Sequence, residues 1–310
     1  MTVVVPFSSA EAAPGPVEPQ GGTGLRPVAQ LIRLPNLLMM LLCLALVRAG
    51  LLQPAQPLRT LLDWRFGVLA VAALCVAAAG YIINDYYDVK IDAINRPGRL
   101  VVGRVVNRRR AMLAHMLLSG VGVGLSGLLS PLLGLVNLGS ALLLWGYSVR
   151  FKRVALVGNV SIATLTGALV LLPELQLRTG VVSVWQYALA AFLLTVVREI
   201  VKDVEDMRGD AQHDCHTLPI VWGVARTKWV AGLFLAALVA LVAGACGHAL
   251  THSRLVLGGW LLLAVLGPLL WLGRLLLRAD RRRHFAQLSR WCKGIMLAGV
   301  LSMLLVEVLR

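Results

Sequence analysis

Six long runs of the chain contain no Asp, Glu, Lys or Arg, and their side chains are mostly apolar. A helix needs about 20 such residues to cross the hydrocarbon core of a bilayer, and each run has about that length or more. Only 15% of the chain is charged and 58% is hydrophobic, whereas a soluble domain has about 25% charged residues. The runs predict an integral membrane protein and exclude a water-soluble globule: residues 66–84, 111–149, 154–173, 179–197, 229–253 and 255–273.

One of these runs is long enough for two crossings. Residues 111–149 would extend about 59 Å as a single helix, twice the bilayer core, and Ser130-Pro131 inside the run predicts a turn. Two further spans, residues 37–52 and 294–309, carry one charge each. The sequence therefore predicts an all-α integral membrane bundle of nine transmembrane helices.

The positive charges indicate how the bundle is inserted. If the N-terminus is cytoplasmic, most of the 30 Lys and Arg lie before the first span or in the loops after spans two, four, six and eight, on the cytoplasmic side. This bias predicts a multi-pass protein of the inner (cytoplasmic) membrane in contact with its lipids, and explains the net charge of +15 without nucleic acid. Residues 1–30, rich in Pro, Gly, Ala and Glu, are predicted to be a disordered cytoplasmic tail, and residues 31–310 the transmembrane domain.

Most of the 15 acidic residues lie in two short segments, at the cytoplasmic ends of spans two and six. In the first segment, Asn84, Asp88 and Asp92 are spaced four residues apart and share one face if the helix of span two continues. Like charges at this spacing destabilise a helix, so a cation is expected between them. Oxygen ligands in this number suit Mg²⁺, which takes one or two carboxylates and completes its shell with water and phosphate.

The second acidic segment, residues 198–210, also places its carboxylates on one face of a helix. Asp203, Asp206 and Asp210 fall on one helical face, with Lys202 adjacent. Two acidic faces mixed with cations at one membrane surface predict a diphosphate clamp. In such a clamp Mg²⁺ joins the carboxylates to phosphate, and Lys or Arg binds the remaining oxygens.

These motifs resemble the signatures of the UbiA-type intramembrane prenyltransferases. The first signature is matched by Asn84-x-x-x-Asp88-x-x-x-Asp92 and the second by Asp206-x-x-x-Asp210. Further matches follow in order along the chain: Asn95-x-Pro97-x-Arg99, Tyr147-Ser148, Phe151-Lys152, Gly158-Asn159 and Thr217-Leu218-Pro219.

The resemblance implies an enzyme with nine helices around a central cavity, which transfers a prenyl group from a prenyl diphosphate with Mg²⁺, or Mn²⁺, as the metal. It implies a catalytic cluster that holds the metal, made of Asn84, Asp88, Asp92, Asp203, Asp206 and Asp210, with Asn84, Asp88, Asp92, Asp206 and Asp210 as the direct ligands. The candidates for direct contact with the diphosphate are Arg99, Tyr147, Lys152, Arg198 and Lys202.

The sequence leaves open which molecule accepts the prenyl group. Residues 198–206 and Thr217-Leu218-Pro219 look most like the geranylgeranylglyceryl phosphate geranylgeranyltransferases, which prenylate a lipid alcohol. Residues 99–103 depart from the family's Arg-Pro-x-x-Ser-Gly pattern, so an aromatic acceptor of quinone biosynthesis, 4-hydroxybenzoate or a naphthoate, stays an alternative. A membrane cation transporter is a remote alternative, because its carboxylates would lie near the midplane and not at one surface.

Overall fold

The computed structural model describes residues 25–95 and 100–306. Within them, nine helical segments are long and apolar enough to cross a membrane, as the sequence predicts. The elements in chain order are α1 (Leu25–Leu31), α2 (Leu34–Leu46), η1 (Val47–Leu52), α3 (Pro57–Leu61), α4 (Trp64–Asn95), α5 (Arg108–Leu129), α6 (Pro131–Val149), η3 (Phe151–Arg153), α7 (Val157–Leu177), α8 (Val182–Ala211), α9 (Leu218–Thr251), α10 (Leu255–Trp260), η4 (Leu261–Leu266), α11 (Gly267–Arg278), α12 (Arg282–Ser302) and η5 (Met303–Leu305).

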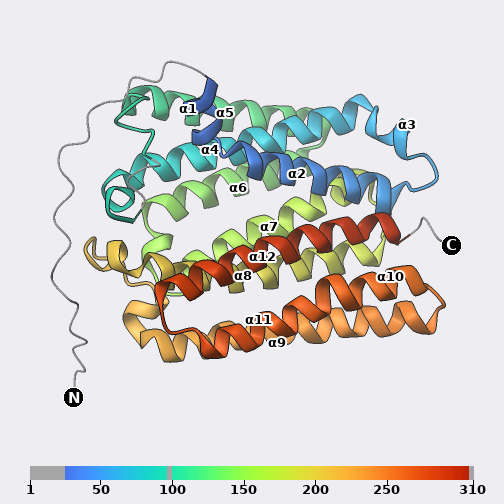
Figure 1. The fold of residues 1–310 in the computed structure, drawn as a ribbon. Coiled ribbons are helices and arrows are strands. Elements are labelled where there is room, and N and C mark those ends of the chain that lie inside the picture. Colours follow the sequence, from blue (N-terminus) through green and yellow to red (C-terminus); the bar gives the residue numbers. More distant parts are fainter. Residues whose placement is uncertain (1–24, 96–99, 307–310) are drawn as a thin grey trace.

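The helices lie side by side in one bundle, as Figure 1 shows. On one side α4, α5 and α6 pack against one another, and on the other α9 packs against α10 and α11. Between these groups lie α7, α8 and α12, and α8 contacts both α4 and α9. The two helices that carry the acidic segments, α4 and α8, are therefore neighbours although they are far apart in the sequence.

The predicted turn at Ser130-Pro131 is confirmed, because α5 ends one residue before Ser130 and α6 begins at Pro131. A proline at the first helical position loses no hydrogen bond. The two helices are joined by a buried hydrogen bond from Asn137 Nδ2 to Ser126 Oγ. Gly122 allows α5 to approach α4, since a Cβ there would lie 2.7 Å from the carbonyl oxygen of Ala72.

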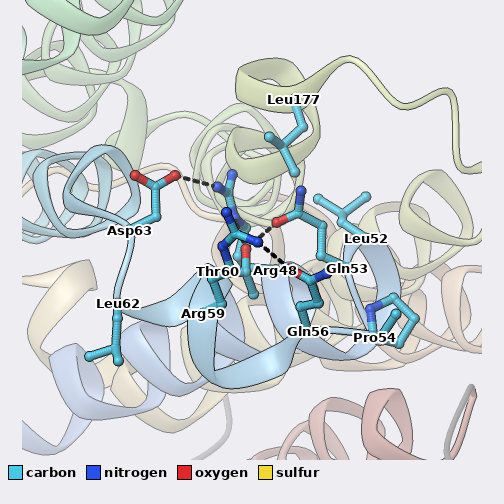
Figure 2. Close-up of a pocket in the computed structure, with 11 residues that line it drawn as sticks. Arg48, Leu52, Gln53, Pro54, Gln56, Arg59, Thr60, Leu62, Asp63 and Leu177 are labelled. Carbon is cyan, nitrogen blue, oxygen red and sulfur yellow. Dashed lines mark hydrogen bonds and ion pairs between the residues drawn. The ribbon is translucent and has the colours of Figure 1, made fainter.

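The first span ends in the π-helical turn η1, and the short helix α3 lies in the connection from this turn to α4. Arg48, on η1, is buried and forms an ion pair with Asp63 (Figure 2). A π-helical turn is uncommon and is often found next to a functional site.

Several helices extend further than the charge-free runs predicted. The last span begins at Arg282, where the sequence predicted a loop up to residue 293. The seventh begins at Leu218 instead of residue 229 and is broken at Gly223, whose φ of 76° is unfavourable for any other residue. Only the hydrocarbon core excludes charge, so a helix continues into the interface with its Lys and Arg side chains reaching water.

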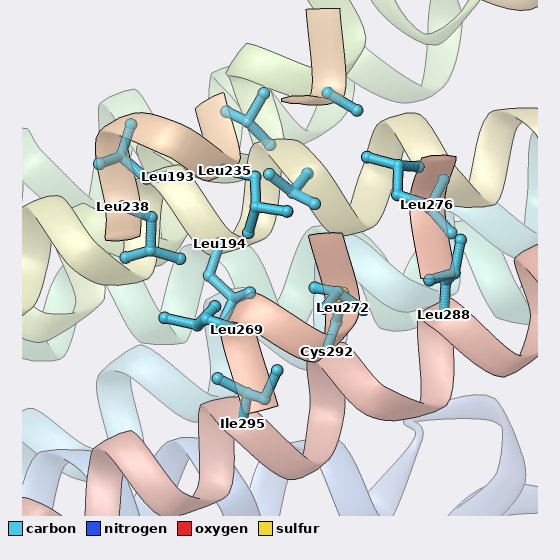
Figure 3. Packing of buried hydrophobic residues seen from close by; sticks show 14 of the residues in the cluster. Leu193, Leu194, Leu235, Leu238, Leu269, Leu272, Leu276, Leu288, Cys292 and Ile295 are labelled. Carbon is cyan, nitrogen blue, oxygen red and sulfur yellow. The ribbon is translucent and has the colours of Figure 1, made fainter. Parts of the chain in front are cut away.

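The largest apolar cluster lies in the C-terminal half of the bundle. It joins α8, α9, η4, α11 and α12, and Figure 3 shows leucines of α8, α9, α11 and α12 packed together with Cys292 and Ile295. A smaller cluster ties the start of the described chain to α4 and α5 through Leu31, Ile82 and Ala111. Residues 1–24 of the predicted tail lie outside the described residues. Residues 25–30 belong to helix α1.

Candidate active site

The structure brings the two acidic segments together. We call Asn84, Asp88, Asp92, Asp203, Asp206 and Asp210 the acidic cluster. All six side chains are partly buried, on the C-terminal turns of α4 and α8. Asp210 lies close enough to Asp206 on its own helix and to Asp88 on α4 for their charges to interact. Both predicted helical faces are continuous, because α4 and α8 extend through the acidic residues without a break.

A lysine from the α6–α7 connection lies between the carboxylates. Lys152, on η3, forms an ion pair with Asp88, and its charge also acts on Asp210. The ion pair is largely buried, with the lysine side chain 9% exposed. Gly158 permits this placement, since a Cβ there would lie 2.9 Å from the Cα of Lys152. Lys152 thus places a positive charge of the protein near Asp88 and Asp210.

Asp203 is held by a residue to which the sequence pattern gave no role. Asn159, a buried residue at the start of α7, donates a hydrogen bond of 2.7 Å from Nδ2 to Oδ2 of Asp203. An amide donor at this distance fixes one oxygen of the carboxylate. The Gly158-Asn159 motif was visible in the sequence, but its partner on α8 was not.

Arg198 and Lys202, two of the residues predicted to bind the diphosphate, interact with a glutamate on their own helix. Glu199 is buried and forms an ion pair with Arg198, and the ammonium of Lys202 lies 3.7 Å from its other oxygen. Lys202 also lies near Asp203 and Asp210. Lys202 is therefore placed between Glu199 and the acidic cluster, whereas Arg198 is oriented by its neighbour in the chain.

Arg33 also lies at the end of the bundle that carries the acidic cluster. In the sequence it indicated only the orientation of the first span in the membrane. It precedes α2 in a left-handed conformation (φ 52°), and its Nη2 donates to Oδ1 of Asp85 at 2.9 Å. The guanidinium stacks 4.9 Å from the centre of the Tyr81 ring and acts electrostatically on Asp92. Arg33 thus connects the entry of the first span to the acidic face of α4.

The tyrosines near the cluster have different surroundings. Tyr147, at the end of α6, lies within electrostatic reach of Asp88 and Asp203, so it belongs to the same region. Tyr86 contacts Tyr87 edge to face at 5.2 Å and lies under the guanidinium of Arg108 at 4.5 Å. Arg99, the remaining residue predicted to contact the diphosphate, lies outside the described residues.

The donor set at this site consists of hard oxygen atoms. Burial raises the pKa of the nearby Cys215 thiol to about 11, and the charge of Asp210 adds to this, so the thiol stays neutral. His213 faces the carbonyl oxygen of Gly209 at 3.0 Å. Among the described residues no three His, Cys, Asp or Glu side chains form a ready-made metal cage. Hard oxygen donors suit Mg²⁺, which binds through one or two carboxylates and takes water and phosphate oxygens for the rest.

A family model described as the UbiA prenyltransferase family matches residues 33–297. The chain belongs to this family. The matched residues include both acidic segments, Lys152 and Arg33.

Curated relatives from archaea carry the name digeranylgeranylglyceryl phosphate synthase. The protein of Methanospirillum hungatei is 34% identical over 183 residues, which cover 58% of this chain and 63% of the relative. That of Methanopyrus kandleri is 37% identical over 171 residues, which cover 55% of this chain and 63% of the relative. The chain therefore matches less than two thirds of the length of these relatives.

Solved structures share the fold. One, described as concerning digeranylgeranylglyceryl phosphate synthase in membranes, has a TM-score of 0.67 at 23% identity and covers 90% of this chain and 98% of that one. A UbiA homologue from Archaeoglobus fulgidus, solved with GPP and Mg²⁺, has a TM-score of 0.62 at 17% identity, with coverage of 90% and 99%. Both likenesses support the UbiA fold for this chain.

Proposed function

We propose that this protein is a prenyltransferase that moves a prenyl group from geranylgeranyl diphosphate to the hydroxyl group of geranylgeranylglyceryl phosphate, with Mg²⁺ as cofactor. The observation that carries the proposal is the meeting of two acidic helical faces, from α4 and α8, around Lys152. A solvated pair of helix ends would have no reason to bring Asp88 and Asp210 together.

In the proposed site, the acidic cluster would hold Mg²⁺, and the cationic side chains would bind the diphosphate directly. Asn84, Asp88, Asp92, Asp206 and Asp210 supply the oxygen ligands for Mg²⁺, and Asn159 keeps Asp203 oriented beside them. Bound Mg²⁺ would neutralise the negative charge that builds on the leaving diphosphate. Mn²⁺ offers the same preference for oxygen ligands and is proposed as a substitute.

Cationic side chains complete the binding of the diphosphate. Lys152 and Lys202 lie beside the carboxylates and bind phosphate oxygens, and Arg198 and Arg99 are the further cations predicted from the sequence. Tyr147 offers an aromatic face to positive charge developing on the allylic carbon. The allylic C–O bond breaks with its electron pair going to the diphosphate, the acceptor oxygen forms the new ether bond, and its proton is released.

The acceptor and the orientation are supported by separate observations. The named relatives favour a phosphorylated lipid alcohol as the acceptor. The Lys and Arg residues concentrated at the same end as the acidic cluster favour a cytoplasmic active site in the inner membrane.

The test is a transfer assay with purified protein, Mg²⁺ and labelled geranylgeranyl diphosphate. Separate reactions contain geranylgeranylglyceryl phosphate, 4-hydroxybenzoate or dihydroxynaphthoate, and each is repeated with EDTA. We expect label in a doubly prenylated glycerol lipid, lost with EDTA and in Asp88→Ala. Label in an aromatic product would keep the reaction and replace the acceptor. Transfer that persists in EDTA would contradict the metal assignment.

A further inference from the structure

A cavity lies at the end of the bundle away from the acidic cluster. It has a volume of about 1110 Å³ and lies between η1, α3, the start of α4 and the end of α7 (Figure 2). Asp63, in its wall, is separated from Asp85 by a stretch of α4 that is about 33 Å long at 1.5 Å per residue. The hydrocarbon core of a bilayer has about this thickness, so the cavity and the acidic cluster lie at opposite membrane surfaces.

Arg48 places a fixed positive charge in the wall of the cavity. The residue is 2% exposed, and its guanidinium donates to Oγ1 of Thr60 (2.7 Å), Oε1 of Gln176 (2.9 Å) and Oδ2 of Asp63 (2.9 Å). The Thr60 hydroxyl in turn donates to the amide oxygen of Gln53. These bonds tie η1, α3, α7 and the connection before α4 together and hold the charge of Arg48 in one orientation.

Arg59 adds a second positive charge that no carboxylate offsets within the described residues. Its side chain is exposed on α3, and Nη1 donates to Oε1 of Gln56 at 3.2 Å. Asp63 is the single acidic residue in the lining, against two arginines. The cavity therefore has a net positive charge and several amide groups that can donate hydrogen bonds.

The rim of the cavity has the character of a membrane interface. Leu58, Leu62 and Trp64 are 75%, 84% and 67% exposed, and Leu62 belongs to the lining. Exposed leucines beside a transmembrane helix contact lipid, and Trp is enriched at the depth of the headgroups. The arginines of the cavity are thus at the depth of lipid phosphates.

We propose that this cavity binds the phosphate headgroup of an anionic phospholipid from the leaflet opposite the acidic cluster. Arg59 binds the phosphate at the mouth of the cavity, and Arg48, paired with Asp63, holds the wall in place. Leu52 and Leu177 line the apolar side, where the first methylene groups of the acyl chains lie. The net positive charge favours an anionic headgroup over a zwitterionic one.

The experiment measures lipid binding to the full chain by native mass spectrometry. Delipidated protein is titrated with phosphatidylglycerol or phosphatidylcholine, as wild type and as Arg59→Gln. We expect wild type to retain phosphatidylglycerol and Arg59→Gln to bind it about ten-fold more weakly, since one charge-assisted contact is lost. The matched control is Arg178→Gln, an exposed arginine at the end of α7 that does not line the cavity and should bind as wild type.

Two outcomes would overturn the proposal. The first is equal retention of phosphatidylglycerol by wild type and Arg59→Gln, provided that both have the same melting temperature without lipid. The second is displacement of the lipid by millimolar inorganic phosphate, which would identify the ligand as a soluble anion. The assay reads binding and not prenyl transfer, so its outcome is independent of the proposed enzymatic function.

Discussion

The hydrogen bond between Asn159 and Asp203 offers a quantitative test of how the acidic cluster is held. Asn159→Ala removes a 2.7 Å bond to a carboxylate at a site where the amide is 5% exposed. A hydrogen bond to a charged group contributes about 1.5–3 kcal/mol, which corresponds to about 10- to 150-fold in an equilibrium constant. If Asp203 must be oriented for metal and diphosphate to bind, this loss raises the Mg²⁺ concentration that gives half-maximal transfer by at least about ten-fold.

The assay is a Mg²⁺ titration of prenyl transfer, combined with thermal unfolding in detergent. The control is Asn137→Ala, because Asn137 is also buried and its side chain bonds to Ser126 within the α5–α6 hairpin. Both variants should lose stability, by about 1 kcal/mol or more. Only Asn159→Ala should change the Mg²⁺ requirement. An unchanged requirement in Asn159→Ala, or the same change in both variants, would refute the role assigned to Asn159.

Two further predictions concern packing and the first span. Gly122→Ala should destabilise the protein by about 1–3 kcal/mol, because its Cβ would lie 2.7 Å from the carbonyl oxygen of Ala72, whereas Gly124→Ala meets no atom within 4 Å. Equal melting temperatures for the two variants would contradict this. Arg33→Gln should lower kcat/KM for the prenyl diphosphate about ten-fold, since it removes the ion pair with α4, whereas Arg26→Gln should not. Matching kinetics for both variants would exclude a role for Arg33 at the site.

The parts of the fold set by hydrophobic periodicity could be predicted from the sequence. Charge-free runs identify spans because unpaired charge is costly in the hydrocarbon core, and Ser130-Pro131 marks a turn because proline interrupts helical hydrogen bonding. The four-residue spacing of Asn84, Asp88 and Asp92 also defines a helical face without knowledge of the packing.

The parts set by tertiary contact could not be predicted in this way. Arg33, which pairs with Asp85, looks in the sequence like any other charge before a span, and only the packing of α2 on α4 gives it a partner. Asn159 gains its role from Asp203 on the next helix. The start of α12 at Arg282 was missed because a charged helix end in the interface has the composition of a loop.

The most direct test of the central claim is whether both acidic helices are needed for one metal-dependent binding event. Binding of geranylgeranyl diphosphate is measured by calorimetry, without acceptor, with Mg²⁺ or EDTA, for wild type, Asp88→Ala and Asp206→Ala. Asp280→Ala is the control, since Asp280 is exposed and its carboxylate contacts His284. The account predicts binding that requires Mg²⁺ and is lost in either cluster variant but kept in the control. Mg²⁺-dependent binding that survives in Asp88→Ala or Asp206→Ala would contradict a single site formed by α4 and α8.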